Sequence, residues 1–120
     1  MHRILVDACG WVAVIEAGIN IDLALKECCG YNELAIVPNV ISELEALKNP
    51  RLLVSMLEKK ALMCDPPQEV GRHTDDQLYS LATQNNWPIL TVDTELKRRL
   101  SQSNSSWVEV SGRSHLRLVE

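Results

Sequence analysis

The chain has 120 residues, a hydrophobic fraction of 46% and a formal net charge of −4 at pH 7. This length predicts one domain over residues 1–120. The composition excludes a disordered chain, which needs low hydrophobicity and a high net charge. No apolar run reaches the roughly eighteen residues of a membrane-spanning helix, and Asp7 interrupts the apolar N-terminal run. Neither a membrane protein nor a secreted one is therefore expected, and the expected location is cytoplasmic.

The N-terminal half alternates short apolar runs with helical patterns. The apolar, β-branched run over 3–7 predicts a buried strand, and Gly30 suits a helix end because glycine adopts the left-handed conformation without strain. Pro38 closes a second strand, Asn39 suits a helix cap, and Pro50 suits the first turn of a helix. The elements expected here are strands over 3–7 and 34–37 and helices over 11–17, 21–29, 39–48 and 51–60.

The C-terminal half continues the alternation. Thr74 with Gln77 three residues later has the form of a capping box, in which two side chains satisfy free N–H groups at a helix start. The elements expected here are strands over 61–64, 89–92, 107–110 and 116–119 and helices over 74–84 and 94–100. This alternation predicts an α/β fold with a mostly parallel central sheet flanked by helices on both faces. The C-terminal ends of its strands share one edge, where ligands bind in such folds.

The four cysteines, Cys9, Cys28, Cys29 and Cys64, include no C-x-x-C pair, and the three histidines are not at zinc-finger spacing. A structural zinc site is therefore not expected. We expect all four to be buried thiols in a reducing compartment.

Five acidic side chains are expected at the C-terminal edge of the sheet. Asp7 and Asp93 end two strands, Glu43 lies one turn into the helix after another strand, and Asp75 and Asp76 lie in the first turn of a helix. We expect four of them to converge in one small pocket: Asp7, Glu43, Asp75 and Asp93. Two unit charges at 4 Å repel by roughly 4 kcal/mol at an effective dielectric of about 20, so such a cluster requires a counter-ion.

Each of these acids also has a simpler interpretation. Asp75 and Asp76 suit a helix N-terminus through the helix dipole alone. Glu43 has the pattern of a solvated helix residue, as does Glu45, and Asp93 suits an N-cap. Asp7 is the strongest candidate, because an acid that ends an apolar strand has no equally obvious structural role. A cluster of carboxylates that holds Mg²⁺ or a similar hard cation suits phosphodiester hydrolysis.

Three segments together resemble the PIN-domain ribonucleases across nearly the whole chain: ILVDACGWV, VPNVISELEAL and HTDDQLYSLATQNNWPILTVDTELKRRL. The D-D pair, the run ELKRRL and the ending VSGRSHLRL resemble, more narrowly, archaeal PIN proteins related to small-subunit rRNA-processing nucleases. The resemblance implies a Rossmann-like three-layer fold, Mg²⁺ or Mn²⁺ as cofactor, and endonucleolytic cleavage of RNA. It implies that Asp7, Glu43, Asp75 and Asp93 are catalytic and bind metal, with Asp76 as the alternative third acid.

Two further residues are expected to support the acids. Position 9 is often Asn or Ser in the family and is Cys9 here, and a thiol hydrogen bonds only weakly. Thr91 is interpreted as a residue that orients Asp93 or a water on the metal.

The basic run Lys97, Arg98 and Arg99 follows Asp93 within about two helical turns, or roughly 10 Å. Leu96 and Leu100 share the buried face of that helix, so we expect the basic side chains to face solvent and bind RNA phosphates. The simpler alternative is that they only complement the helix dipole, in which case Arg113 or Arg117 would bind RNA.

Three functions stay open at this point. The leading hypothesis is a Mg²⁺- or Mn²⁺-dependent endoribonuclease, with rRNA processing as a role. The alternatives are a VapC-type toxin RNase covered by an antitoxin, and a catalytically weak module that binds RNA or ribosome-assembly factors; a homodimer is compatible with each. A base-stacking platform is excluded by the lack of Phe and the few Tyr and Trp residues, and a phosphate-loop enzyme by the lack of its motif.

Overall fold

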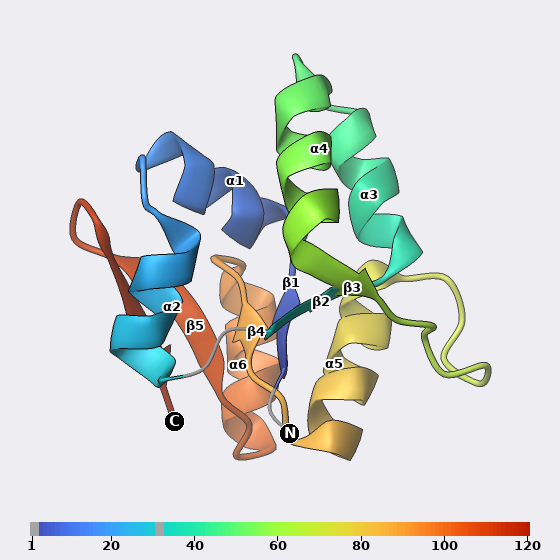
Figure 1. The fold of residues 1–120 in the computed structure, drawn as a ribbon. Helices are drawn as coiled ribbons and strands as arrows, with labels where there is room; N and C mark the ends of the chain where they lie inside the picture. Colours follow the sequence, from blue (N-terminus) through green and yellow to red (C-terminus); the bar gives the residue numbers. More distant parts are fainter. Residues whose placement is uncertain (1–2, 31–32) are drawn as a thin grey trace.

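A central sheet with the strand order β3-β2-β1-β4-β5-β6 organises the computed structural model, which describes residues 3–30 and 33–120 (Figure 1). β1 pairs in parallel with both β2 and β4, which places β1 at the middle of the sheet, and only the pairing of β5 with β6 is antiparallel. The predicted mostly parallel sheet is confirmed. The strands are β1 Arg3–Val6, β2 Glu33–Ile36, β3 Ala61–Met63, β4 Ile89–Leu90, β5 Trp107–Ser111 and β6 His115–Val119.

Helices cover both faces of this sheet, which confirms the predicted three layers (Figure 1). α5 and α6 pack together on one face, whereas α2 packs on β6 and α4 on β3 at the other face, with α1 and α3 against α4. The helices are α1 Ala8–Glu16, α2 Ile21–Cys29, α3 Pro38–Glu45, α4 Pro50–Lys60, α5 Thr74–Asn85 and α6 Thr94–Gln102.

Burial of the neighbouring strands β1 and β2 explains their apolar sequences. Side chains of β1 and β2 are buried from their second residue onward, as expected for parallel strands that helices cover on both faces. Trp11 of α1 is fully buried, and its indole N–H donates to the carbonyl of Leu53 in α4 at 3.0 Å. This contact fixes α1 against α4.

Gly10 brings α1 unusually close to the end of β4. A Cβ atom at this position would lie 2.3 Å from the carbonyl oxygen of Leu90, which is shorter than any real contact. Glycine is required here because only a residue without a side chain permits this approach of two backbones. The start of α1 therefore lies directly against the carboxyl end of β4.

Three predicted helix starts differ from the structure. α1 begins at Ala8 rather than at 11, because the Asp7 side chain caps it by accepting the Ala8 N–H at 2.9 Å. α3 begins at Pro38, one residue before the predicted cap. The predicted capping box at the start of α5 is wrong. The N-cap of α5 is His73, and its side chain makes no capping hydrogen bond. The two side chains of that box bond elsewhere, Thr74 to Glu43 and Gln77 to the carbonyl of Gly71.

The prediction of four buried thiols is also wrong. Cys28 and Cys29 form a disulfide at the end of α2, and Cys9 and Cys64 are free and half-buried. Consecutive helical positions point about 100° apart, so a helix packed along one side does not bury both fully.

Among the helices of residues 3–30 and 33–120, none is by itself long and apolar enough to cross a membrane. α1 and α2 taken together reach that length and composition, but they are bent by 109° relative to each other.

Candidate active site

Asp7 lies at the carboxyl end of β1 and is only 5% exposed. Its Oδ1 accepts the Ala8 N–H, and its Oδ2 accepts the hydroxyl of Thr91 at 2.9 Å and the thiol of Cys9 at 3.2 Å. Both carboxylate oxygens are therefore held by donors that come from different parts of the chain. This fixes the Asp7 side chain in one orientation at the sheet edge.

Thr91 connects the first acid with the last. Its fully buried hydroxyl donates to Asp7 and accepts the backbone N–H of Asp93 at 3.1 Å. Asp93 in turn caps α6, because its Oδ1 accepts the N–H of Leu96 at 3.0 Å. The capping role that the sequence allowed for Asp93 is present, and it leaves Oδ2 outside the cap.

Cys9 contacts both Asp7 and Thr91. Its sulfur lies 3.5 Å from the Thr91 hydroxyl as well as 3.2 Å from Asp7. Burial raises the pKa of the Cys9 thiol, and the negative charge of Asp7 raises it further. The thiol therefore stays protonated at neutral pH and serves as a weak hydrogen-bond donor to Asp7.

Glu43 is exposed on α3 and reaches the site from another side. The hydroxyl of Thr74, the first residue of α5, donates to its Oε2. This hydrogen bond joins the helix after β2 to the helix before β4. Glu43 is therefore positioned by one hydroxyl, whereas three donors hold Asp7.

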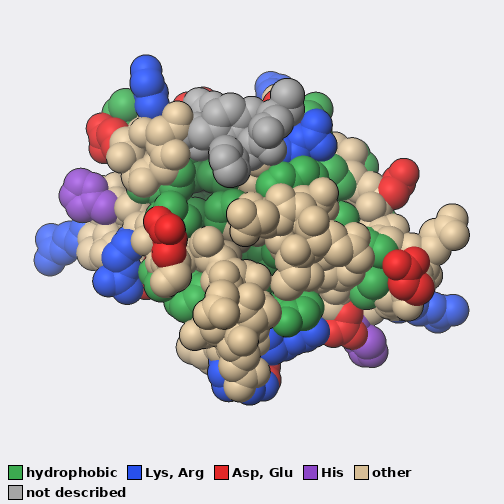
Figure 2. Space-filling model, turned by 90° about the horizontal axis from the view of Figure 1, so that it is seen from below, with side chains coloured by type: hydrophobic (Ala, Val, Ile, Leu, Met, Phe, Trp, Pro, Cys, Tyr) green, Lys and Arg blue, Asp and Glu red, His purple; other side chains and the backbone are tan. Residues whose placement is uncertain are grey.

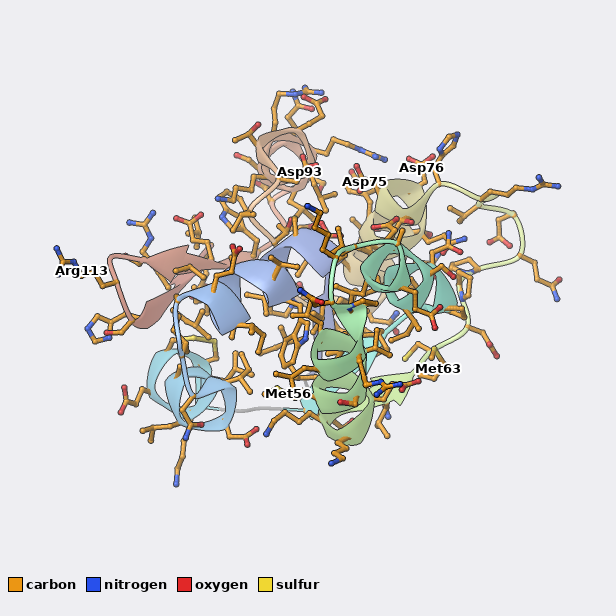
Figure 3. All side chains as sticks on the ribbon, turned by 90° about the horizontal axis from the view of Figure 1, so that it is seen from above. Met56, Met63, Asp75, Asp76, Asp93 and Arg113 are labelled. Atoms are coloured by element: carbon orange, nitrogen blue, oxygen red, sulfur yellow. A yellow bond between two sulfur atoms is a disulfide. The ribbon has the colours of Figure 1, made fainter. Side chains whose placement is uncertain are left out.

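The pKa of Asp75 shows that the four acids lie close to one another. Burial raises its pKa, and the charges of Asp7, Asp93 and Glu43 raise it further, while Arg99 acts in the opposite direction. Figure 3 looks onto this edge and shows Asp75 and Asp93 at the first turns of the two neighbouring helices α5 and α6. Four carboxylates from separate segments thus lie within reach of each other's charge.

Asp76, the neighbouring acid, has a different environment. Its Oδ1 forms an ion pair with the guanidinium of Arg99 at 2.9 Å, and that guanidinium lies 4.5 Å from the ring centre of Tyr79. Asp76 therefore has a cation of its own. Of the two acids that the sequence left open, Asp75 is the one that interacts with the other carboxylates.

Two depressions lie beside these acids. One depression is lined by Glu43 and Asp75 and another by Glu43 and Cys9, and Asp7 and Asp93 line neither. Within residues 3–30 and 33–120, no three His, Cys, Asp or Glu side chains are arranged to hold one metal ion. Asp7 and Asp93 each accept hydrogen bonds from within the fold, Asp75 is half-buried, and Glu43 is exposed.

The chemistry of this set nevertheless fits a hard divalent cation. All the side chains offer carboxylate oxygens, which Mg²⁺ and Mn²⁺ prefer. The raised pKa of Asp75 shows negative charge that is not balanced locally, and a cation would balance it. Glu43 and Asp75 would offer oxygens to such a cation from the helices α3 and α5, and Asp7 and Asp93 would offer oxygens held by hydrogen bonds.

The opposite edge of the sheet provides a contrast. Figure 2, seen from below, shows hydrophobic side chains at the centre of this face and acidic and basic side chains spread around its rim. A depression on this side includes one acidic residue, Glu120, beside Pro88 and Leu118. The acids therefore cluster at the carboxyl edge of the sheet rather than at the opposite edge.

Two of the three basic residues of α6, Lys97 and Arg99, are not displaced to solvent as predicted. Lys97 forms an ion pair with Glu109 of β5 at 2.9 Å, Arg99 pairs with Asp76, and Arg98 pairs with Glu95 on the same helix. Only Arg98 is exposed. The reason is that positions 97 and 99 flank the buried stripe of α6 and so reach acids on its neighbours.

Glu109 forms ion pairs with Lys97 and Arg117, two of the basic residues that the sequence analysis considered for RNA binding. A hydrogen bond from Lys97, the largest cause, and others from Trp107 and Arg117 lower its pKa to about 2, against the opposing effect of burial. Arg117 is thus also ion-paired. Arg113 is exposed in the turn between β5 and β6, and Figure 3 shows it far from Asp75 and Asp93.

Arg72 and His73 were missed by the sequence reasoning. Both line the depression that contains Glu43 and Asp75, together with Asn39, Ser42 and Thr74. Their position directly before the T-D-D run was the available signal, because residues adjacent to Asp75 must lie near it.

Comparison with known proteins agrees with this architecture. The profile of the PIN like domain family matches residues 4–113, which is nearly the whole chain. Among solved structures, the PIN domain endonuclease Utp24 superposes with a TM-score of 0.84 over 97% of this chain and 90% of that one, at 18% sequence identity. No curated protein matches significantly in sequence. The chain therefore belongs to the PIN like domain family.

Proposed function

We propose that this protein is a metal-dependent endoribonuclease whose active site consists of Asp7, Glu43, Asp75 and Asp93. The observation that carries the proposal is that Thr91 joins Asp7 and Asp93 by hydrogen bonds at the carboxyl edge of the sheet, beside Asp75 and Glu43. An acidic cluster of this kind is costly without a cation. A protein that only binds RNA gains nothing from such a cluster, since it repels phosphates.

The side chains divide the work of such a site. Asp7 and Asp93 are held in place through Thr91 and supply fixed carboxylate oxygens. Glu43 and Asp75 lie at the accessible side and complete the ligand set. Mg²⁺ or Mn²⁺, when bound there, supplies Lewis acidity toward the scissile phosphate and its attacking water.

RNA is the proposed substrate because the motifs resemble PIN-domain ribonucleases, and the structural neighbour Utp24 is itself an endonuclease. The narrower resemblance to rRNA-processing nucleases makes precursor rRNA the first substrate to test. A cytoplasmic location, a homodimer and protein partners stay predictions.

Cleavage assays on Glu43 and Glu45 test the proposal most directly. Both acids are exposed on α3 or its end, but only Glu43 contributes to the environment of Asp75. We expect RNA cleavage to require Mg²⁺ or Mn²⁺ and to stop with EDTA. Glu43→Gln should lower the rate by about a hundredfold or more, because it removes a metal ligand. Glu45→Gln should leave the rate within about twofold.

Asp7→Asn provides a second test from the fixed side of the site, and its expected loss is also orders of magnitude. Cleavage that survives in both Glu43→Gln and Asp7→Asn, in preparations shown to lack contaminating RNase, would exclude the proposed mechanism.

A further inference from the structure

The segment 71–74 lies at the surface, and several side-chain hydrogen bonds hold it in place. The Asn39 amide donates to the carbonyl of Arg72 at 2.7 Å, and the Gln77 amide donates to the carbonyl of Gly71 at 2.9 Å. Thr74 then bonds Glu43. Side chains of α3 and α5 therefore fix this segment from both sides, although Gly71, Arg72 and His73 are all exposed.

The fixed segment forms one wall of a depression of about 440 Å³ beside the proposed active site. Its lining combines the two acidic residues Glu43 and Asp75 with Arg72 and His73. Within the described part of the chain, Arg72 has no ion pair, in contrast to the paired Arg98 and Arg99. The backbone of Arg72 is thus held at the rim of the depression, and its side chain, unpaired among the described residues, is available to a ligand.

We propose that Arg72, assisted by His73, binds an RNA phosphate adjacent to the one that is cleaved. The inference rests on the proposed function, because it assumes that the acids act on a phosphodiester. A strand that enters an acidic site places its neighbouring phosphates close to carboxylates and needs a cation there. The guanidinium suits this role because its planar fork matches the oxygens of a phosphate.

The competing explanation is structural: Arg72 only offsets the charge of Glu43 and Asp75 in the free protein. The two explanations differ in what Arg72→Ala changes. Loss of a phosphate contact weakens RNA binding and its salt dependence and leaves the thermal midpoint unchanged. Loss of a structural counter-ion lowers the thermal midpoint and leaves the salt dependence unchanged.

The test measures binding of a short, labelled, single-stranded RNA by fluorescence anisotropy at several salt concentrations in Mg²⁺. The Asp7→Asn background is used so that the RNA stays intact. We expect Arg72→Ala to weaken binding roughly tenfold and to reduce the slope of log K against log salt by about 0.7, the value for one phosphate contact on a single strand. Arg72→Lys should recover part of the affinity. The matched control is Arg113→Ala, which removes an equally exposed arginine far from the site and should change nothing.

An unchanged salt slope in Arg72→Ala, or an equal loss in Arg113→Ala, overturns the inference. Cleavage by the protein without Asp7→Asn separates this inference from the proposed function. If that protein cleaves no RNA but Arg72-dependent binding persists, the proposed function fails, and Arg72 is a phosphate-binding residue with no cleaved phosphate beside it. If cleavage depends on Glu43 and Asp7 but binding ignores Arg72, the proposed function stands and this inference fails.

Discussion

The acidic edge and the basic residues of α6 carry charges of opposite sign, and they differ most in how those charges are balanced. At the edge, Asp75 lies among three other carboxylates, and burial together with their negative charges raises its pKa. On α6, each of Lys97, Arg98 and Arg99 faces an acid in an ion pair. The first region has more charge than the fold balances, whereas the second is balanced internally.

This difference distinguishes residues that bind a ligand from residues that stabilise the fold. A balanced ion pair satisfies both members and leaves no demand for a partner. An unbalanced cluster is unfavourable in isolation, so it indicates a ligand of opposite charge. The same criterion distinguishes adjacent residues, since Asp75 lies among carboxylates and Asp76 has Arg99.

The largest expected effect tests that pair of neighbours. Asp75→Asn should lower RNA cleavage by about a hundredfold or more, because it removes a proposed metal ligand. Asp76→Asn, the matched control, should keep the rate within a fewfold, since that carboxylate pairs with Arg99. Single-turnover cleavage assays measure both. The reverse result would make Asp76 the third acid and would contradict the charge criterion.

The pH dependence of Asp75 sharpens the same comparison. A pKa that is raised in the folded protein means that the native state binds the proton more tightly, so its destabilising effect is full above the folded pKa and disappears as the pH falls through it. Metal-free Asp75→Asn should therefore melt slightly higher than the natural protein at pH 7. That gain should be lost in acid.

A smaller loss of activity is expected from Thr91. Thr91→Val removes the hydroxyl that orients Asp7 and leaves the Asp93 N–H without its buried acceptor. Cleavage should fall about 10- to 100-fold, and stability by roughly 1–3 kcal/mol. Thr91→Ser retains the hydroxyl and should behave nearly as the natural protein in cleavage and urea unfolding. A fully active valine variant would show that this hydrogen bond does not position the acids.

Glu109 tests the balanced region through stability. Its folded pKa of about 2 lies below the ordinary value of 4.5, so its contribution is present above pH 4.5 and is lost as the pH falls toward 2. Glu109→Gln should cost roughly 1–3 kcal/mol at pH 7, and the difference from the natural protein should shrink in acid. Urea unfolding at several pH values measures this. A difference that is the same at every pH would refute the ion-pair explanation.

The smallest effect is expected at Arg98. Its pair with Glu95 is exposed on both sides, so Arg98→Ala should change stability by less than about 0.5 kcal/mol. RNA binding by the same variant shows whether any part of α6 contacts RNA. A reduced salt slope would show that Arg98 contacts RNA, as first predicted for this helix. An unchanged slope would indicate that Arg98 does not contact RNA.

The fold was predictable because its signals are local. Apolar strand runs, proline positions and glycine caps depend on neighbours in the chain, and these located every strand of the sheet to within a few residues. Helix starts were less predictable where side chains bond across the structure. Thr74 and Gln77 match a capping box in sequence, but tertiary contacts with Glu43 and Gly71 take both side chains.

The site was predictable in part for the same reason. Asp7 and Asp93 follow strands, so their place at the sheet edge follows from topology. The choice between Asp75 and Asp76 depends on which way one helical turn faces, and the partners of Lys97 and Arg99 lie on other elements. Arg72 was missed because its role depends on a depression formed by α3 and α5, which no short motif describes.

The hydrogen bond from Thr91 to Asp7 joins residues 84 positions apart. During synthesis, therefore, the first acid leaves the ribosome long before its partner exists. A growing chain cannot complete the site until residue 93 has been added and β4 has paired beside β1. If the protein is the nuclease proposed here, a growing chain therefore stays inactive until β4 has folded beside β1 and brought Thr91 to Asp7.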